Sequence, residues 1–249
     1  MNVWKAGREI EYMRRAGAIV AECHALFAEQ IRPGADTRNL DARVEDYIRK
    51  SGAIPSFKGH HGFPASICVA LNDEICHGFP RKQPLSEGDV VTIDIGAQVE
   101  GYHGDSAWTY AVGEVSPDIR HLMEACEKAL FLGIEQARPG NRIGDIGHAI
   151  QSFAEPLGYG VVREFCGHGV GRELWESPQI PHFGQAGTGP RIQAGMTLAI
   201  EPMITLGDWK ARMDDDGWTA RTADGSICVQ YEHTVWVTED GPVILTEKK

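Results

Sequence analysis

The chain has 249 residues, enough to bury a substantial core, and a formal net charge of −11, with 35 acidic side chains against 24 Lys and Arg. This acidic balance argues against sequence-independent nucleic-acid binding, which depends on basic side chains that neutralise phosphates. Residues 1–17 carry charges throughout, so they predict neither a secretory signal nor a membrane span and favour a cytoplasmic protein. Six scattered cysteines without a C-x-x-C pair indicate reduced thiols.

The first part of the chain predicts two helices followed by strands. Apolar residues at helical spacing predict a helix over residues 9–30, which Pro33 and Gly34 bring to an end. We expect a second helix to be capped by Thr37 and to end at Gly52. Short β-branched or alternating runs then predict strands over residues 66–71, 89–97 and 103–112.

The second part of the chain repeats this plan, with helices predicted over residues 117–137 and 145–157. Glu29–Gly34 (EQIRPG) ends the first helix of the chain, and Glu135–Gly140 (EQARPG) ends its counterpart. The predicted strand that contains Asp94 corresponds to the one that contains Glu201, at nearly the same separation along the chain as these two helix ends. Chance does not readily explain such an ordered series of matches.

An internal repeat of this size predicts the architecture of the whole chain. We expect a single α+β domain over residues 1–249, made of two helix-helix-strand halves of roughly 1–112 and 113–249. The halves are expected to pack about a pseudo-twofold axis with their strands joined in one curved antiparallel sheet. Corresponding carboxylates would then face each other across the axis.

Four carboxylates fall in or beside apolar predicted strands: Asp94, Asp105 and, in strands expected over residues 196–204 and 227–237, Glu201 and Glu232. An unpaired charged carboxylate in such a place costs several kcal/mol of desolvation. Each one alone is better explained by backbone N–H groups at a strand end or by a distant Arg. Four of them under an internal repeat, without Lys or Arg neighbours in sequence, predict a bound metal.

His168 adds a nitrogen ligand within Cys166–Gly171 (CGHGVG), where glycines let the backbone run close to a site. The glycines do not indicate a phosphate loop, because the Walker Lys-Ser/Thr pair is missing. Several carboxylates with one imidazole suit Mn, Fe or Co, with Zn also compatible. Two such ions would form a hydrolytic site. The sequence contains neither a G-x-S-x-G elbow nor an H-E-x-x-H helix, which argues against the other common hydrolases.

Six ordered segments resemble a known family. They are Cys76–Pro80 (CHGFP), Val91–Gly96 (VTIDIG), His103–Ser106 (HGDS), Cys166–Arg172 (CGHGVGR), Ile200–Pro202 (IEP) and Gln230–Thr234 (QYEHT). Together they are similar to type I methionine aminopeptidase, nearly from end to end. The resemblance implies the pita-bread fold, a dinuclear metal centre and the minimal bacterial form of the enzyme, which is usually a monomer.

The resemblance also implies the roles of individual residues. It assigns Asp94 to one metal ion, Asp105 and Glu232 to both, and His168 and Glu201 to the other. Glu201 is also the expected general base, and His77 is expected to contact the substrate and the tetrahedral intermediate. The two ions would be Co, Mn, Fe or Zn. The substrates would be the N-termini of nascent polypeptides or peptides, whose initiator methionine is removed when the second residue is small.

The sequence departs from the family pattern at the substrate pocket. Trp175 stands where the family has a second histidine that donates a hydrogen bond to the scissile carbonyl. An indole can donate one hydrogen bond but is bulkier and does not titrate. Phe57, His60 and Leu174 replace common Cys, Tyr and Phe. The expected substrate-binding residues are His61, His77, Phe63, Trp175 and Trp218.

Alternatives to initiator methionine removal follow from these departures. One is an aminopeptidase paralogue with altered specificity or reduced activity owing to Trp175. Another is a non-catalytic binding protein on the same fold, although such proteins usually lose metal ligands and this sequence keeps all five. Prolidase and aminopeptidase P share the fold and ligands, but they usually carry a large N-terminal domain for which 249 residues leave no room.

Overall fold

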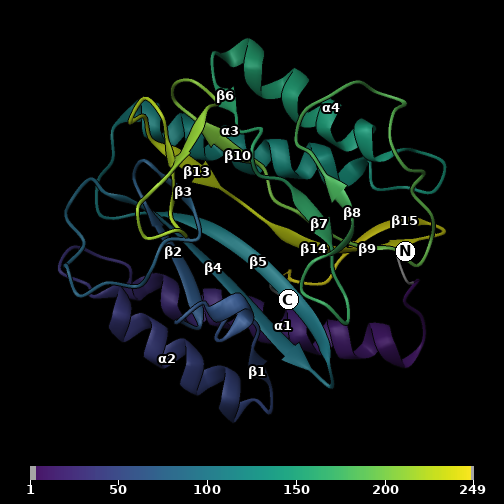
Figure 1. The fold of residues 1–249 in the computed structure, drawn as a ribbon, viewed down its shortest axis with the longest axis horizontal. Coiled ribbons are helices and arrows are strands. Elements are labelled where there is room, and N and C mark those ends of the chain that lie inside the picture. The colour runs from purple at the N-terminus through teal and green to yellow at the C-terminus, as the bar shows by residue number, and fades with distance from the viewer. Residues whose placement is uncertain (1–3, 248–249) are drawn as a thin grey trace.

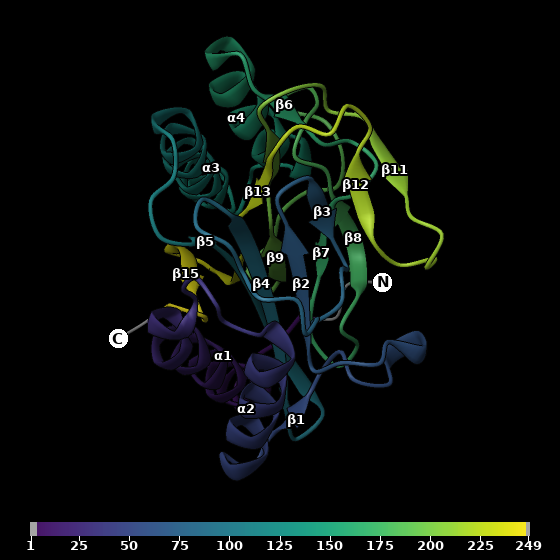
Figure 2. The ribbon, with the colours of Figure 1, turned by 90° about the vertical axis from the view of Figure 1, so that its left-hand side faces the viewer.

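The computed structural model describes residues 4–247. Two helix pairs lie at opposite ends of a layer of antiparallel strands, with α1 and α2 at the bottom and α3 and α4 at the top of Figure 1. After a turn of 90° all four helices lie along one side of the strands, whereas β8 and the β11–β12 hairpin lie on the other (Figure 2). Within residues 4–247, no helix combines the length and apolarity needed to cross a bilayer.

Within residues 4–112, the first half of the chain forms two α-helices and five strands: α1 (Arg8–Phe27), α2 (Thr37–Lys50), β1 (Ile54–Pro55), β2 (Ile67–Leu71), β3 (Glu74–Cys76), β4 (Val90–Val99) and β5 (Tyr102–Ala111). A 3₁₀ turn over Ala28–Gln30 extends α1 to the end of the predicted helix. The prediction for the start of α2 was one residue wrong. Asp36 is the capping residue, because its side chain accepts hydrogen bonds from the backbone N–H groups of Arg38 at 2.8 Å and Asn39 at 3.3 Å.

The second half also begins with two helices, α3 (Pro117–Glu135) and α4 (Ile143–Ala154). Ten strands follow: β6 (Gly160–Val161), β7 (Gly167–Gly169), β8 (Glu176–Ile180), β9 (Thr197–Ile200), β10 (Met203–Thr205), β11 (Ala211–Met213), β12 (Ala220–Thr222), β13 (Cys228–Gln230), β14 (His233–Thr238) and β15 (Gly241–Ile244). Ser116 caps α3 through its hydroxyl, and Pro117 occupies the first helical position, where its missing N–H is not needed.

The two larger sheets of the structure are antiparallel. β4 pairs with β1, β2 and β5, and the second sheet has the order β15-β14-β9-β7-β8. Beneath α1 and α2, buried residues such as Val20, Val44 and Ile93 form one hydrophobic cluster. Beneath α3 and α4, Leu130 and Ile150 belong to another. Each fully buried aliphatic side chain contributes about 2 kcal/mol of transfer free energy, so the two clusters hold the helices against the sheets.

The two sheets meet where β5 lies beside β14. Asp105 N–H donates to Thr234 Oγ1 at 3.0 Å, and the Thr234 hydroxyl donates back to the Asp105 carbonyl at 2.8 Å. Ser106 Oγ donates to the Glu232 carbonyl at 2.6 Å, and Glu232 N–H donates to Ala107 O at 2.8 Å. Segments far apart in the sequence are therefore joined at residues that were predicted to bind metal.

The predicted strands over 196–204 and 227–237 are each interrupted, which corrects the sequence prediction. β9 stops at Ile200, and β10 begins only after Glu201 and Pro202, since proline has no N–H to donate to a ladder. The second break separates β13 from β14 at residues 231–232, where the Glu232 N–H bonds across to the other half. Both predicted glutamate ligands thus lie at breaks between strands.

Candidate metal centre and substrate pocket

A cavity of about 460 Å³ lies between the two halves of the chain. All five predicted metal ligands line it: Asp94 and Asp105 from the first half, and His168, Glu201 and Glu232 from the second. Predicted pocket residues His77, Phe63, Trp175 and Trp218 line it as well. The structure therefore brings together residues that the sequence analysis selected from widely separated segments.

Asp94 and Asp105 lie on neighbouring strands and on the same face of the sheet. Asp94 on β4 is opposite Ala107, and Asp105 on β5 is opposite Gly96, so the two aspartates are diagonal neighbours. The turn between the strands is made by Glu100 and Gly101, both with positive φ. A tight hairpin thus fixes the register that directs both carboxylates into the same cavity.

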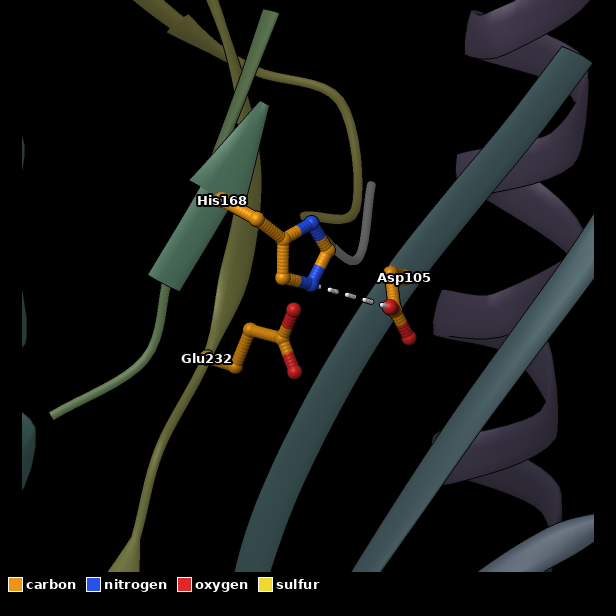
Figure 3. Close-up of side chains that lie close together, drawn as sticks. All are labelled: Asp105, His168 and Glu232. Carbon is orange, nitrogen blue, oxygen red and sulfur yellow. Dashed lines mark ion pairs between the residues drawn. The ribbon is translucent and has the colours of Figure 1, made fainter. Parts of the chain in front are cut away.

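His168 on β7 points its ring toward the carboxylates (Figure 3). Its Nε2 lies 3.4 Å from Glu201 Oε1 and 4.0 Å from Asp105 Oδ2. Its Nδ1 lies 3.0 Å from the Gly169 carbonyl and takes the donor role there, which leaves the Nε2 lone pair facing the cavity. One ligand atom each from Asp105, His168 and Glu232 lies within 4.8 Å of the others.

The carboxylates need a positive partner that the described residues do not supply. Asp94 Oδ1, Asp105 Oδ1 and Glu232 Oε1 are buried and receive no hydrogen bond within residues 4–247. Over the same residues, no Lys or Arg forms an ion pair with them or with Glu201. A cluster of buried, unpaired carboxylates is costly in a folded protein unless a cation or protons neutralise it.

The pKa values of these groups show the same cost of burying charged side chains. Burial raises the pKa of Asp94 well above its ordinary range, and the charges of Asp105 and Glu201 raise it further. Burial raises the pKa of Asp105 to about 7 and that of Glu232 well above its ordinary value. Burial lowers the pKa of His168 to about 4, so the imidazole is neutral, as a ligand must be. Four carboxylates and one neutral imidazole fit divalent metal ions.

The wall of the cavity is aromatic. Phe63 stacks on Phe79 with ring centroids 5.4 Å apart and meets Trp218 edge-on at 5.2 Å. His77 follows β3 in a left-handed conformation with φ 58°. Burial lowers its pKa, so its ring is neutral. Leu174 is fully buried behind this wall, in the same hydrophobic cluster as Phe63. The lining therefore combines an apolar aromatic wall with polar side chains, His77 among them.

Trp175 lies at the mouth of the cavity with 45% of its surface exposed. Its indole stacks on His61 at 5.7 Å between ring centroids and meets His60 edge-on at 4.7 Å. The His168 ring centroid is 6.4 Å away. His61 itself is exposed and does not line the cavity, so its predicted direct contact with substrate is not supported by its position. It contacts two residues that do line the cavity, Trp175 and His60.

Two residues that hold Glu201 were missed by the sequence analysis. Gln230 Nε2 donates to Glu201 Oε2 at 3.1 Å, and the Glu201 N–H donates to His182 Nε2 at 3.3 Å. His182 is fully buried, although the sequence analysis gave it no role. Neither contact has a local sequence signal, because the partners come from different strands and loops.

Comparisons with known proteins agree with this geometry. The profile of metallopeptidase family M24 matches residues 11–239. The chain is 50% identical to methionine aminopeptidase 1 of Bacillus subtilis (strain 168), with 99% of each chain covered. It is 47% identical to methionine aminopeptidase of Clostridium acetobutylicum, again with 99% of each covered.

The solved structures include methionine aminopeptidase from Thermotoga maritima, with a TM-score of 0.98, 43% identity and full coverage of both chains. Prolidase from Pyrococcus furiosus gives a TM-score of 0.80 at 25% identity, and the match covers 100% of this chain and 66% of that one. These matches confirm the predicted α+β, pita-bread fold.

Proposed function

The chain belongs to the methionine aminopeptidases of metallopeptidase family M24, and on that premise we propose that it removes the initiator methionine from nascent polypeptides and peptides when the second residue is small. The observation that carries the proposal is the cavity in which four carboxylates, His168 and an aromatic wall converge. We further propose that it acts as a cytoplasmic monomer.

Two divalent ions, Co, Mn, Fe or Zn, would be held by Asp94, Asp105, His168, Glu201 and Glu232. Such ions supply a nucleophile at neutral pH and polarise the scissile carbonyl. The proposal is supported by the buried oxygens of Asp94, Asp105 and Glu232 that receive no hydrogen bond within residues 4–247. It is also supported by the position of the His168 Nε2 lone pair, which faces the carboxylates.

Glu201 is proposed as the general base of the reaction. Gln230 holds its Oε2 through a hydrogen bond of 3.1 Å, so its Oε1 is left facing the cavity and His168. This arrangement orients one oxygen to accept a proton from the attacking water and later deliver it to the leaving amine. His77, whose ring is neutral, is proposed to donate a hydrogen bond to the oxygen on which negative charge develops.

The apolar wall is proposed to bind the methionine side chain. A thioether packs favourably against aromatic rings, and Phe63 and Trp218 present two of them in an edge-on arrangement. Trp175 and His60 narrow the mouth of the cavity, where the second residue of the substrate would lie. Their bulk is consistent with a preference for a small second residue.

The test is release of methionine by the Mn-loaded protein from Met-Gly-Met-Met and from a matched peptide with a large second residue. Glu201→Ala is expected to lower kcat for the first peptide by a factor on the order of a hundred or more, because a positioned general base contributes that much. The exposed Glu239→Ala serves as the control and is expected to behave like the wild type. Full activity in Glu201→Ala would remove Glu201 from the proposed mechanism.

The same assay separates the alternatives. Release of other first residues in preference to methionine would favour an aminopeptidase paralogue, for which the comparisons give no support. Cleavage of Xaa-Pro peptides alone would favour a prolidase-like activity. Tight metal binding without hydrolysis of any peptide would instead indicate a binding protein on this fold.

A further inference from the structure

Arg221 connects two walls of the substrate cavity. It lies on β12, and its guanidinium forms ion pairs with Asp73 at 2.7 Å, Glu74 at 2.7 Å and Asp214 at 2.5 Å. Asp73 and Glu74 lie at the start of β3, whereas Asp214 begins the loop between β11 and β12. All three nitrogens of one planar group are therefore used to join two separate segments.

Glu74 makes this connection rigid. It is only 2% exposed, and its other oxygen accepts hydrogen bonds from Leu71 N–H at 2.8 Å and from Arg81 Nη2 at 2.5 Å. The carboxylate thus ties together both ends of the segment 71–81. β3 and β12 are also paired as strands, with Arg221 opposite Glu74. Buried charge-assisted bonds of this kind hold a fixed geometry better than exposed pairs do.

Each segment tied by Arg221 presents a side chain to the cavity. The segment 71–81 carries His77, in its left-handed turn, together with Phe79, which stacks on Phe63. The loop after Asp214 carries Trp218, whose backbone N–H is held by the Asp216 carboxylate at 2.8 Å. Arg221 itself does not line the cavity.

We propose that Arg221 is a positioning residue that sets substrate specificity, because its ion pairs fix the separation between the His77 turn and the Trp218 loop. Because His77 and Trp218 both line the cavity, that separation would set the space available to the first side chain of the substrate. The Phe63 and Trp218 rings contact each other edge-on and form one wall, which the His77 segment contacts through Phe79. Displacement of the Trp218 loop would widen the space beside this wall and admit branched or bulkier side chains. The inference rests on the proposed function, since it concerns the side chain that the cavity selects.

The test compares Arg221→Met with wild type on two peptides, Met-Gly-Met-Met and Leu-Gly-Met-Met, with kcat and KM measured separately. In this variant Glu74 keeps its bonds to Leu71 and Arg81, so the His77 turn is expected to stay in place while the Trp218 loop moves. We expect KM for the methionine peptide to rise about tenfold, the range that pocket contacts contribute to discrimination, while kcat changes little. We expect the preference for Met over Leu to shrink by a similar factor. Arg221→Lys keeps the charge but not the planar fork, so it is expected to restore part of the wild-type KM and part of the preference for Met over Leu.

Arg212→Met is the matched control, because Arg212 also pairs with Asp214, at 2.8 Å, but is exposed and, within residues 4–247, forms no ion pair with Asp73 or Glu74. It is expected to keep the wild-type KM and preference. A purely structural role for Arg221 would lower the folded fraction and reduce kcat equally for both peptides, without changing KM or the preference, and that result would overturn the proposal. If Arg221→Met does not fold, the same comparison is made with Arg221→Lys. A reduced preference for Met over Leu supports the proposal, and an unchanged preference overturns it. An inactive wild type overturns the proposed function instead, and this inference with it.

Discussion

Trp175 is the residue at which the chain departs most clearly from the pattern it otherwise follows. The indole stands where the family pattern predicts a hydrogen-bond donor to the scissile carbonyl. In the structure the indole is half exposed, stacked on His61 and in edge contact with His60. It lies close to the His168 ring, so a side chain that replaces it would lie beside a proposed metal ligand.

We expect Trp175→His to raise kcat/KM for Met-Gly-Met-Met by about tenfold or more, because a second imidazole restores a donor to the carbonyl oxygen. Trp175→Phe is the control, since it keeps an aromatic ring against His61 but removes the indole N–H. It is expected to be no faster than wild type. Equal rates for the histidine variant and wild type would mean that the indole already serves the reaction as well as an imidazole does.

His24 provides a pH-dependent contribution to stability away from the cavity. Its ring is hydrogen-bonded to Tyr110 Oη at 2.9 Å and to the Ser106 carbonyl at 3.0 Å, and burial lowers its pKa from 6.5 to about 4. The folded protein therefore binds its proton less readily than the unfolded chain. The contribution is complete above pH 6.5 and is lost as the pH falls toward 4.

When the pH is lowered from about 7.5 to about 5, we expect the free energy of unfolding of the wild type to fall by about 2 kcal/mol more than that of His24→Gln. Urea unfolding at the two pH values measures this difference. Other buried histidines contribute to both proteins and cancel in this comparison. Parallel pH profiles for the two proteins would show that His24 does not carry this dependence.

Helix α1 lies directly on the backbone of its neighbours. A Cβ added at Gly17 would stand 2.3 Å from the Leu245 carbonyl oxygen, and one added at Gly104 on β5 would stand 2.6 Å from Gly17 N. Both neighbours are backbone atoms, which cannot rotate away as a side chain can. The absence of a side chain at these two positions therefore sets how close α1 comes to β5 and to the C-terminal segment.

Gly17→Ala is expected to destabilise the fold by about 1–3 kcal/mol, because overpacking against backbone outweighs the roughly 1 kcal/mol that alanine gains over glycine in a helix. Chemical denaturation measures the change. Ala18→Ser, at the exposed neighbouring position, is expected to change the stability by less than about 0.5 kcal/mol. A more stable Gly17→Ala variant would show that α1 can move away from the sheet at little cost.

The helices were predictable because their signal is local. The spans of α1, α2, α3 and α4 follow from apolar spacing and breaker residues, although the cap of α2 was misplaced by one residue and the end of α3 and the start of α4 by two each. The strand breaks at Glu201 and Glu232 were not predictable, because they depend on bonds to other elements.

The candidate site also contains residues that could be predicted from the sequence and residues that could not. The predicted ligands could be selected because charged residues in apolar runs stand out in a sequence. His182 and Gln230 could not, because their importance lies in a contact with Glu201 that exists only after folding.

At the scale of the whole molecule, the cavity belongs to neither half alone. Asp94 and Asp105 come from one sheet, and His168, Glu201 and Glu232 come from the other or from its edges. The bonds between Asp105 and Thr234 hold the two sheets together at the cavity. We infer that the halves, roughly 1–112 and 113–249, are structural repeats whose packing is stabilised by the metal that they share.

Removal of metal is therefore expected to destabilise the whole fold. At a free metal concentration of about 100 times Kd, binding contributes about 2.7 kcal/mol, which a chelator abolishes and which a thermal melt detects as a lower Tm. Glu232→Gln is expected to be more stable than wild type in chelator, because one of several mutually repelling carboxylates is gone, and to gain less from Mn²⁺. The same metal-dependent rise in Tm for both proteins would exclude Glu232 as a ligand.

The position of Glu232 in the chain has a consequence for how the protein is made. A chain emerges from the ribosome N-terminal end first, and its domains fold in that order. The cavity obtains its full set of carboxylates only after residue 232 has been synthesised and has paired with Ala107. On the proposed function, a new molecule is inactive while most of it is being translated.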